Sequence, residues 1–468
     1  MRSADKFTIE KLGIGEQTLI ERAGNVVATE IINRLRGGRV LVCIGKGKNG
    51  EDGKVIASIL SKVHGFTVAT LNVYNGIFKM FDKKFDIIVD CIFGTGLNRE
   101  VEGKYREAIE KINGSGAYVV SCDIPSGLNS DTGEIMGVCV KADLTVAIQE
   151  LKLGHFLGEG KDCCGTVVAK DIGISIWGDD YAKRLNKEDC AKYFPERKNN
   201  VNKGNFGKVA VVGGSKNYVG SALLSANALV ALKMGTGYSY LFVPESLFPV
   251  YAGKNPEIIV NTLPDKDGNF VFDEESMKKL LPFNTVCIGM GIGKSEQVYK
   301  MIAYLLENFT GKLVIDADGL NSLSEYGVDI LLNKKCQIVL TPHIGEFSRL
   351  IKTDKVKIIK NPIEFAKDFA EKYKIVLLLK SAVSVITDGD NVYINTNGNS
   401  GLSKAGSGDV LDGILGGILN RSSDVLEGTA VSSFIFGLSG DIAKKEQNEY
   451  TITASDVIGA LPKTINSL

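Results

Sequence analysis

The sequence predicts an α/β protein of two domains, each built on a parallel sheet with crossover helices. Its 468 residues exceed what one hydrophobic core usually serves. Short β-type runs alternate with helical runs in both halves, and the strand-and-turn pattern restarts at residues 203–207. A polar stretch around Trp177 and Pro195 is typical of a linker, so the domains are expected at 1–185 and 186–468.

The N-terminal half begins with two expected helices, because apolar residues recur at helical spacing over 8–35 and a glycine segment at 13–15 interrupts them. A β-type run at 40–44 then leads into a glycine turn at 45–53 and a helical stretch at 54–63. This order is typical of the phosphate-binding unit of doubly wound folds. Further strands are expected at 67–73, 86–92 and 117–122, and Asp90 and Asp123 each precede a glycine turn at a strand end.

The C-terminal half repeats the alternation with a larger expected sheet. Helices such as 222–234 and 297–308 separate its strands, which are expected at 208–212, 238–243, 286–290, 312–315, 337–340 and 375–379. The carboxyl ends of parallel strands meet at one edge of a sheet, so the glycine turns that follow these strands are the expected functional segments.

The most informative segment is the glycine turn at 406–408, which leads into an apolar helix. Unpaired backbone N–H groups at a helix start carry partial positive charge and can hold phosphoryl oxygens. Asp409 lies in the first turn, where its carboxylate can accept a proton from a hydroxyl that attacks phosphorus. The alternative is that Asp409 caps its own helix, and both roles can hold, since capping would keep it ionised.

Lys+Arg and Asp+Glu both number 55, so the formal net charge is zero. The composition therefore excludes a strong overall positive charge that would attract nucleic acid or anionic membranes. No apolar run approaches the length of a bilayer span. The nine cysteines lack paired zinc spacing, and no secretory signal is recognised, which favours reduced thiols. A soluble cytoplasmic protein without a nucleic-acid or membrane partner is therefore expected.

With these motifs in view, the chain resembles the bifunctional NAD(P)H-hydrate repair enzymes, which join an N-terminal NAD(P)HX epimerase to a C-terminal ADP- or ATP-dependent NAD(P)HX dehydratase. The resemblance runs from about Asp5 to Leu461. It implies a Rossmann-like three-layer α/β/α domain followed by a larger ribokinase-like α/β domain. Its ordered motifs lie at 45–53, 94–97, 123–128, 142–146, 151–152, 203–207, 213–215, 289–293, 316–321, 341–347 and 406–413.

The resemblance implies a repair reaction on nicotinamide cofactors that have added water. The C-terminal domain would use ADP, or ATP in some members, to phosphorylate the C6 hydroxyl, after which phosphate leaves and the ring double bond returns. The N-terminal domain would interconvert the two C6 epimers. The expected substrates are NADHX and NADPHX, Mg²⁺ would accompany the nucleotide, and a homo-oligomer is expected.

For the dehydratase, the resemblance implies that Asp409 is the general base and that Gly406 and Gly408 hold the transferring phosphoryl group. The hydrated cofactor would be bound by Ala222, Gly291, His343 and Asp409. Because the helix entry near Gly220 is longer than the family's usual spacing, Ser221 is the alternative to Ala222. The adenine nucleotide would contact Lys380 and the residues after it, Ser381 (usually a glycine), Ala382, Val383 and Ser384.

For the epimerase, the resemblance implies proton transfer at C6 by Asp123 and a potassium ion held by Asn49, Asp90 and Ser126. Lys48 and Glu51 depart from the family's Asn-Asn-Gly-Gly-Asp motif. The positive charge of a lysine suits a pyrophosphate, whereas a glutamate must point away from it. The cofactor's phosphate and ribose region would meet Lys48, Asn49, Gly50, Glu51 and Asp52, and the facing loop would be Gly94, Thr95, Gly96, Leu97, Asn98, Arg99 and Glu100.

Two rival functions remain open at this point. The glycine turn with Asp409 also suits a ribokinase-like kinase of a small vitamin alcohol, although the N-terminal half argues against it. The departures at Lys48 and Glu51 leave open a non-catalytic nucleotide-binding module in that half. Each candidate also has a structural reading, since a turn histidine such as His343 is more often hydrogen-bonded than a ligand.

Overall fold

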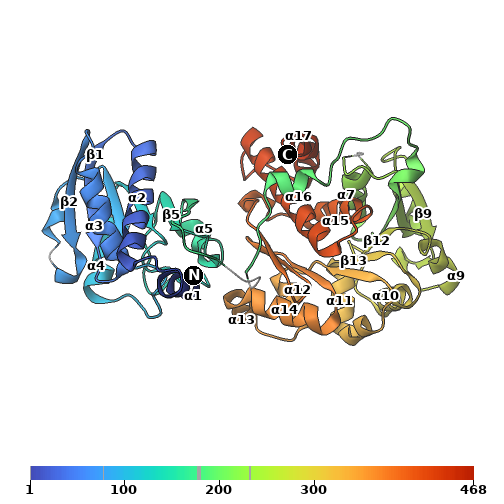
Figure 1. The fold of residues 1–468 in the computed structure, drawn as a ribbon. Helices are drawn as coiled ribbons and strands as arrows, with labels where there is room; N and C mark the ends of the chain where they lie inside the picture. The colour runs from blue at the N-terminus through green and yellow to red at the C-terminus, as the bar shows by residue number, and fades with distance from the viewer. Residues whose placement is uncertain (1, 77, 177–180, 231–232) are drawn as a thin grey trace. The chain divides into compact units, whose positions relative to one another are not determined.

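The computed structural model describes residues 2–76, 78–176, 181–230 and 233–468 (Figure 1). These fall into two compact units, Met1–Asp179 and Asp180–Leu468, which we describe separately. Trp177 and the neighbouring part of the expected linker lie outside the described residues, as do residues 231–232 of the expected helix at 222–234. Lys183 forms backbone hydrogen bonds with Val392 and Ile394. It therefore belongs to the second unit, whereas the expected boundary was at 185.

The first unit is built on a six-stranded parallel sheet in the order β2-β1-β3-β4-β5-β6. The strands are β1 (Gly38–Ile44), β2 (Phe66–Asn72), β3 (Ile87–Cys91), β4 (Tyr118–Cys122), β5 (Leu144–Ile148) and β6 (Thr166–Lys170). The helices are α1 (Arg2–Glu10), α2 (Glu16–Arg34), α3 (Lys48–Leu60), α4 (Gly103–Asn113) and α5 (Gly160–Cys163). The strands expected at 40–44, 67–73, 86–92 and 117–122 are all present, within about two residues at their ends.

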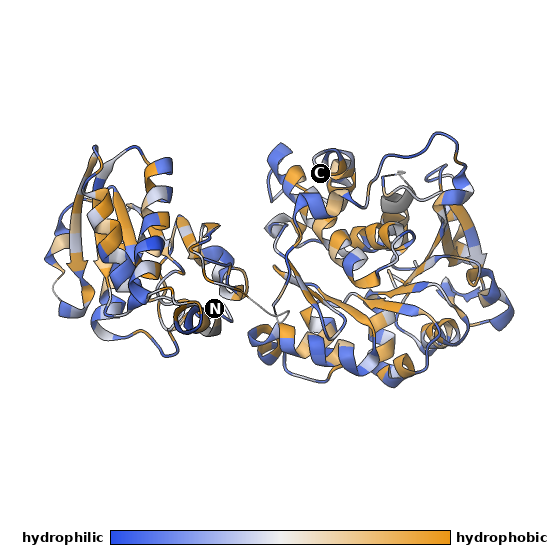
Figure 2. Ribbon diagram, viewed as in Figure 1, coloured by the Kyte–Doolittle hydropathy of each residue, from blue (hydrophilic) through white to orange (hydrophobic). Residues whose placement is uncertain are grey.

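Side-chain alternation along the central strands builds a core on each face of this sheet. Val40, Val42 and Ile44 pack with α2 and α3, whereas Leu41 and Cys43 point to the other face and pack with α4. The sheet therefore lies between two helical layers, and the three-layer arrangement expected for the first domain is confirmed (Figure 2).

The glycine turn after β1 is shorter than expected, because α3 begins at Lys48 rather than near residue 54. A Cβ on Gly45 would overlap the carbonyl oxygen of Ile92, and one on Gly50 would overlap the carbonyl oxygen of Gly45. These glycines bring the start of α3 against the segment that follows β3. The candidate residues 48–52 consequently lie on the first turns of a helix and not on a loop.

The second unit is built on a nine-stranded sheet in the order β17-β16-β15-β14-β13-β12-β7-β8-β9. Its parallel strands are β7 (Lys208–Val212), β8 (Tyr238–Pro244), β9 (Ile259–Leu263), β12 (Thr285–Ile288), β13 (Lys312–Ile315), β14 (Gln337–Leu340) and β15 (Val376–Leu379). Antiparallel strands β16 (Ser384–Thr387) and β17 (Val392–Asn395) extend one edge, and β10 (Asp265–Lys266) and β11 (Asn269–Phe270) form a separate small hairpin. All six expected strands are present, whereas β9 and the antiparallel strands were not anticipated.

Helices cover both faces of the second sheet (Figure 1). One face carries α7 (Val219–Val230), α15 (Ser407–Leu419), α16 (Val425–Glu446) and α17 (Ala454–Asn466). The other face carries α10 (Glu296–Asn308), α11 (Ala317–Tyr326), α12 (Ile344–Leu350) and α14 (Pro362–Tyr373). The shorter helices are α6 (Lys187–Ala191), α8 (Phe248–Tyr251), α9 (Glu274–Met277) and α13 (Lys355–Lys360).

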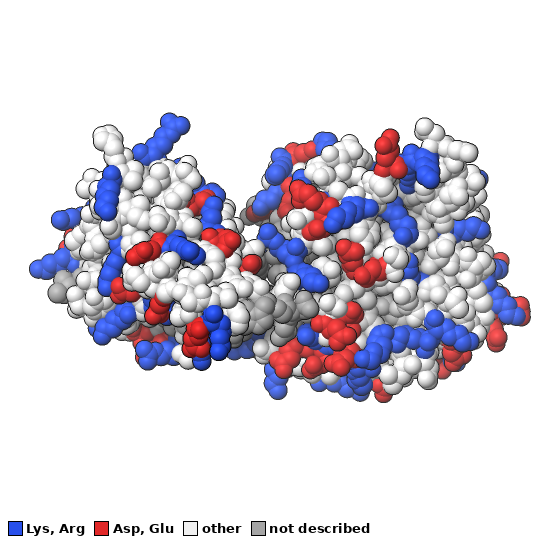
Figure 3. Space-filling model, in the orientation of Figure 1, with Lys and Arg blue, Asp and Glu red and all other residues white. Residues whose placement is uncertain are grey.

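The surface of each unit carries both signs of charge. On the face drawn in Figure 3, acidic and basic side chains lie interspersed, as the equal totals of the sequence predict. Among the described helices, none combines the length and the apolar character that a membrane crossing requires.

Candidate functional site

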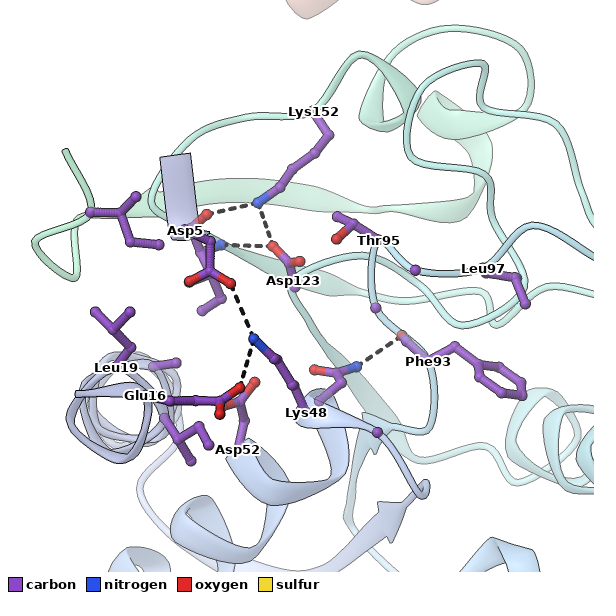
Figure 4. Close-up of a pocket in the computed structure, with 18 of the residues that line it drawn as sticks. Asp5, Glu16, Leu19, Lys48, Asp52, Phe93, Thr95, Leu97, Asp123 and Lys152 are labelled. Atoms are coloured by element: carbon purple, nitrogen blue, oxygen red, sulfur yellow. Dashed lines mark hydrogen bonds and ion pairs between the residues drawn. The ribbon is translucent and has the colours of Figure 1, made fainter. Parts of the chain in front are cut away.

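A pocket of about 870 Å³ lies at the carboxyl end of the first sheet (Figure 4). Its walls come from the segments that follow strands β1, β3, β4 and β5, together with side chains of α1 and α2. Parallel strands bring these segments to one edge, as expected for a doubly wound sheet. The pocket is large enough to take a nucleotide-sized molecule.

Asp123 is held rigidly at the end of β4. Its φ of 68° lies in the left-handed region, which is unfavourable for a residue with a Cβ and must be supported by its surroundings. Its carboxylate accepts hydrogen bonds from the Lys152 ammonium and from the backbone N–H of Ile148 (3.1 Å). Its carbonyl oxygen lies 2.8 Å from Nε2 of His155. The resulting geometry points a fixed carboxylate into the pocket.

His155 supports this arrangement as a neutral side chain. Its Nδ1 accepts a hydrogen bond from the backbone N–H of Lys152 (3.0 Å), so Nε2 carries the proton that is donated to Asp123. Burial lowers the pKa of His155 to about 4, which keeps the ring uncharged at neutral pH. His155 is thus a hydrogen-bonded turn histidine.

Lys152 lines the pocket, although the sequence analysis assigned it no role. Its side chain is buried, with an exposed fraction of 7%, and it forms an ion pair with Asp123 and donates to the carbonyl oxygen of Ile148 (2.7 Å). The motif at 151–152 contained this residue, but a lone lysine after a strand gives no sign of its partner. Only the approach of β4 to β5 brings the two charges together.

Asp52 also faces the pocket, from the second turn of α3 (Figure 4). Burial raises the pKa of its carboxyl group to about 7, with further contributions from the negative charges of Asp123 and Glu51. At neutral pH this side chain is therefore present in both protonation states, which is unusual for an aspartate.

Lys48 is engaged by carboxylates from the two N-terminal helices. Its Nζ lies 2.7 Å from Glu16 Oε1 and 3.2 Å from Asp5 Oδ2 (Figure 4). These partners raise the pKa of the Lys48 ammonium. Two anionic partners therefore compensate the charge of Lys48 in this structure, and its expected contact with a pyrophosphate stays a prediction.

Three expected binding residues do not line the pocket. Gly50 is buried against Gly45, Glu51 is exposed and paired with Lys54 (2.7 Å), and Glu100 is exposed. The position of Glu51 agrees with the argument that a glutamate must point away from a polyphosphate, and its expected role in binding stays a prediction. The expected residues that do line it are Lys48, Asn49, Asp52, Gly94, Thr95, Gly96, Leu97, Asn98, Arg99 and Asp123.

The three expected potassium ligands, Asn49, Asp90 and Ser126, lie together beneath the pocket. The Asp90 carboxylate is fully buried and accepts hydrogen bonds from the hydroxyl groups of Ser126 (2.6 Å) and Ser121 (2.9 Å) and from two backbone N–H groups. Asn49 donates to the carbonyl oxygen of Phe93 (2.8 Å), which the Ser126 hydroxyl also approaches. The Asn49 Oδ1 atom is buried and has no hydrogen-bond partner among the described residues.

In the second unit, Asp409 lies in the first turn of α15, as expected. Gly406 occupies the N-cap position with a φ of 90°, so Asp409 is not the cap of its helix. Burial, followed by the charge of Asp316, raises the pKa of Asp409 to about 6, and a hydrogen bond with Ser221 opposes this shift. A carboxylate with this pKa is ionised at neutral pH and is a stronger base than an ordinary aspartate.

Lys380 and Asp316 form a buried ion pair behind the glycine turn. Nζ of Lys380 lies 2.7 and 2.9 Å from the two carboxylate oxygens of Asp316, which follows β13. A Cβ on Gly408 would lie 3.5 Å from this Nζ, so the start of α15 faces the pair. The charge of Lys380 and hydrogen bonds lower the pKa of Asp316 against the effect of burial.

Asp412 completes this cluster from one turn further along α15. Burial and the charge of Asp316 raise its pKa well above the usual range. Its Oδ2 is buried and has no hydrogen-bond partner among the described residues if both carboxyl groups are ionised, because an ionised carboxylate can only accept. A proton on Asp412 that is donated to Asp316 removes this conflict, so the two side chains share one negative charge.

The expected cofactor-binding residues of this unit gather around Asp409, but not all expose a side chain. A Cβ on Gly291 would lie 3.0 Å from that of Ser221, the hydrogen-bond partner of Asp409. Ala222 is fully buried in the core, so the geometry favours Ser221 over Ala222 as the side chain that faces a ligand. The backbone of His343 forms an isolated β-bridge with that of Lys380. The His343 side chain caps α12, because its Nδ1 accepts a hydrogen bond from the backbone N–H of Gly345 (2.9 Å).

The expected nucleotide segment after β15 has mixed exposure. Ser381 and Ala382 are exposed and Ser384 is half-buried, whereas the side chain of Val383 is buried in the core. Lys380 itself has an exposed fraction of 20%, so it is half-buried near the glycine turn and not a fully solvated strand-end lysine.

Comparisons with known proteins cover both units. A family model described as NAD(P)H-hydrate dehydratase matches residues 209–463, and one described as YjeF-related protein N-terminus matches residues 16–81 and 73–154. The bifunctional NAD(P)H-hydrate repair enzyme Nnr of Thermofilum pendens is 33% identical over 99% of this chain and 94% of its own length. The enzyme of the same name from Dictyoglomus turgidum is 34% identical over 92% of this chain and 89% of its own length.

Solved structures resemble the second unit. The ADP/ATP-dependent NAD(P)H-hydrate dehydratase of Bacillus subtilis, co-crystallised with ATP and Mg²⁺, aligns with a TM-score of 0.52 at 23% identity. The alignment covers 60% of this chain and 97% of that one. A ribokinase-like superfamily protein of Enterococcus faecalis aligns with a TM-score of 0.52 at 21% identity, over 63% of this chain and 98% of that one. These similarities show a shared ribokinase-like fold.

Proposed function

This chain belongs to the family of bifunctional NAD(P)H-hydrate repair enzymes, and on that premise we propose that it restores hydrated nicotinamide cofactors by two successive activities. The first unit epimerises (R)- and (S)-NAD(P)HX. The second dehydrates (S)-NAD(P)HX to NAD(P)H with ADP, giving AMP and phosphate. The observation that carries this proposal is the similarity over nearly the whole chain, which includes both units and both candidate carboxylates.

In the dehydratase, the Asp409 carboxylate takes the proton of the C6 hydroxyl as that oxygen attacks the terminal phosphorus of the nucleotide. The backbone N–H groups at the start of α15, next to Gly406 and Gly408, hold the phosphoryl oxygens. The pair of Lys380 and Asp316 supports this turn from behind. The phosphorylated ring then eliminates phosphate, which restores the double bond.

ADP, with ATP as the alternative donor, and Mg²⁺ complete the proposal for the second unit. Glu346 is a buried carboxylate near Asp316, and burial together with that neighbouring charge raises its pKa. Lys380 already holds both oxygens of Asp316, so Glu346 is the carboxylate of this cluster that could face an Mg²⁺ ion brought in by the nucleotide. The ion would neutralise charge on the nucleotide polyphosphate.

In the epimerase, Asp123 exchanges a proton at the hydroxyl-bearing C6 of the substrate. Lys152 gives this carboxylate a fixed cationic partner, and His155 holds its backbone. The loop at 94–99 lines the same pocket as Asp123 and would enclose the ring.

We propose a potassium ion at Asn49, Asp90 and Ser126 in the same unit. The unpaired Oδ1 of Asn49 supports this site, because a buried acceptor without a partner costs free energy that a cation would offset. The neighbouring carbonyl of Phe93 and the negative charge of Asp90 suit a hard, weakly bound cation.

Replacing K⁺ by choline at equal ionic strength is expected to lower the thermal midpoint of the first unit. A cation at ten times its dissociation constant stabilises a folded protein by about 1.4 kcal/mol. The measurement is a calorimetric scan of the full chain in KCl and in choline chloride. Asn49→Ala should remove the dependence on K⁺. Equal midpoints of the wild type in the two salts would exclude the site.

The two activities are tested by incubating the purified protein with a mixture of (R)- and (S)-NADHX and ADP. Full recovery of the absorbance of reduced nicotinamide is expected, because epimerisation feeds the R form to the dehydratase. Recovery limited to the S form would leave the first unit as a non-catalytic binding module. No recovery, with turnover of ADP on a vitamin alcohol instead, would favour the rival kinase.

Other expectations remain predictions. They are the assignment of the epimerase to 1–185 and of the dehydratase to 186–468, a homo-oligomeric assembly, and a cytoplasmic location.

A further inference from the structure

Two carboxyl groups reach the epimerase pocket from different elements. Asp123 follows β4, whereas Asp52 lies on α3, and both line the pocket (Figure 4). Asp123 has a buried cationic partner in Lys152. The described residues provide no hydrogen bond or ion pair to the Asp52 side chain, although most of it is shielded from solvent. A carboxyl group without a cationic partner keeps its proton to higher pH than a neighbouring one that is paired. The two groups are therefore expected to differ in protonation.

The charged groups around Asp52 reinforce this difference. The negative charges of Asp123, Glu51 and Asp5 all oppose ionisation of Asp52, and the positive charge of Lys48 favours it. Lys48 is already paired with Asp5 and with Glu16 of α2. On the strand side lie the thiols of Cys91 and Cys122, whose pKa values are raised. Asp52 therefore holds its proton far more readily than an ordinary aspartate, with a pKa of about 7.

The chemistry of the substrate requires both an acid and a base. C6 carries a hydroxyl group and adjoins the ring nitrogen, so inversion through a dehydrated intermediate needs loss of that hydroxyl and addition of water to the opposite face. Loss is assisted by a proton donor, and addition by a proton acceptor. This is the same division of labour as in glycosidases that invert configuration with two carboxyl groups.

We propose that Asp52 is a second catalytic residue of the epimerase, acting as an acid on one face of the substrate ring while Asp123 acts as the base on the other. This inference rests on the proposed epimerase function. Asp52 donates its proton to the C6 hydroxyl, the C6–O bond breaks with its electron pair leaving as water, and the nitrogen lone pair forms a C6=N⁺ bond. A second water attacks C6 from the opposite face and gives a proton to Asp123.

After one inversion the two carboxyl groups have exchanged protonation states. The enzyme is then ready to invert the epimer that it has just formed, with the roles of Asp52 and Asp123 reversed. Such an exchange suits an enzyme that equilibrates two epimers, since neither direction requires a different set of residues. Each inversion also replaces the C6 oxygen by one from solvent.

The test is the rate of epimerisation of (R)-NADHX by full-length Asp52→Asn, with R and S forms separated by chromatography. We expect kcat to fall by about 10²-fold or more, which is typical of a lost acid–base group, with little change in KM. The wild-type pH profile should show an ionisation near that of Asp52, and the variant should lack it. Glu21→Gln, an exposed carboxylate of α2 that does not line the pocket, should match the wild type.

Two results would overturn the inference. A kcat for Asp52→Asn within a few-fold of the wild type, or a loss confined to KM, would leave Asp52 as a binding residue at most. Inversion in ¹⁸O-labelled water without uptake of label at C6 would exclude the dehydrated route. Absence of epimerisation by the wild type would instead contradict the proposed function, so the two failures are distinguishable. A thermal midpoint of the first unit that matches the wild type reports that the variant is folded, because Asp52 lies in that unit.

Discussion

Asp409→Asn is expected to reduce the ADP-dependent dehydration of (S)-NADHX by about 10³-fold, within the range for a lost general base. The amide keeps the size of the side chain and can still hydrogen-bond with Ser221, but it cannot accept the proton of the C6 hydroxyl. The measurement is the initial rate of appearance of reduced nicotinamide, with nucleotide and substrate saturating. The loss should fall on kcat.

The same chain supplies the control for this variant, because epimerisation in the first unit should proceed at the wild-type rate. The thermal midpoint of the second unit should not fall. The pKa of Asp409 is raised to about 6 in the folded protein, so its ionisation above that pH opposes folding, and the neutral amide removes this penalty. Undiminished dehydration by the variant would show that another group is the base.

The wild-type dehydratase should also lose activity as the pH falls through about 6, because protonated Asp409 cannot act as a base. The kcat/KM profile of the wild type reports this ionisation in the free enzyme. In Asp409→Asn, most of the dehydration rate should be lost, and the remaining rate should no longer fall as the pH drops through about 6.

Lys380→Met is expected to destabilise the second unit by about 3–5 kcal/mol, the usual cost of removing one partner of a buried ion pair. It leaves the Asp316 carboxylate, whose exposed fraction is 3%, without its cation and next to Asp412. The measurement is urea unfolding of the full chain, followed by a signal from the second unit. The loss should shrink at low pH, because protonation of Asp316 relieves the unpaired charge.

Two companion variants make this prediction specific. Lys372→Met removes an exposed lysine near Asp329 and should hardly change stability, since such surface pairs contribute little. Adding Asp316→Asn to Lys380→Met should recover part of the loss, as a double-mutant cycle requires for interacting groups. A single variant as stable as the wild type would mean that the pair is not buried in solution.

The fold was largely predictable because its signals are local. A strand, a glycine turn and a helix leave their periodicities in neighbouring residues, so the central strands of both sheets were located correctly. The start of α3 was placed too late, because glycines normally weaken a helix, whereas Gly50 is retained there for its close contact with Gly45. Strands β16 and β17 were missed because each is only four residues long, which is too short for a clear alternation of apolar and polar residues, although each pairs with the strand just before it in the chain.

The candidate site was only partly predictable. Asp409 follows a glycine turn and Asp123 precedes one, and the sequence displays both turns. The structure places Asp123 directly after β4 and Asp409 in the first turn of α15. The roles of Lys152 and Asp316 were not visible, since each depends on a charged partner from another strand. The two anionic partners of Lys48 were equally hidden, because they come from α1 and α2.

The amino-acid sequence alone determined the α/β class, the order of the elements and the position of a carboxylate at the start of α15, since these follow from spacing between residues near in the chain. Tertiary structure alone decided which charges meet and how far each is removed from water. Ion pairing falls off with distance and desolvation grows with burial, and both are set by contacts between distant segments. For that reason the raised pKa of Asp52 and the ion pairs of Lys152 and Lys380 emerge only once the chain has folded.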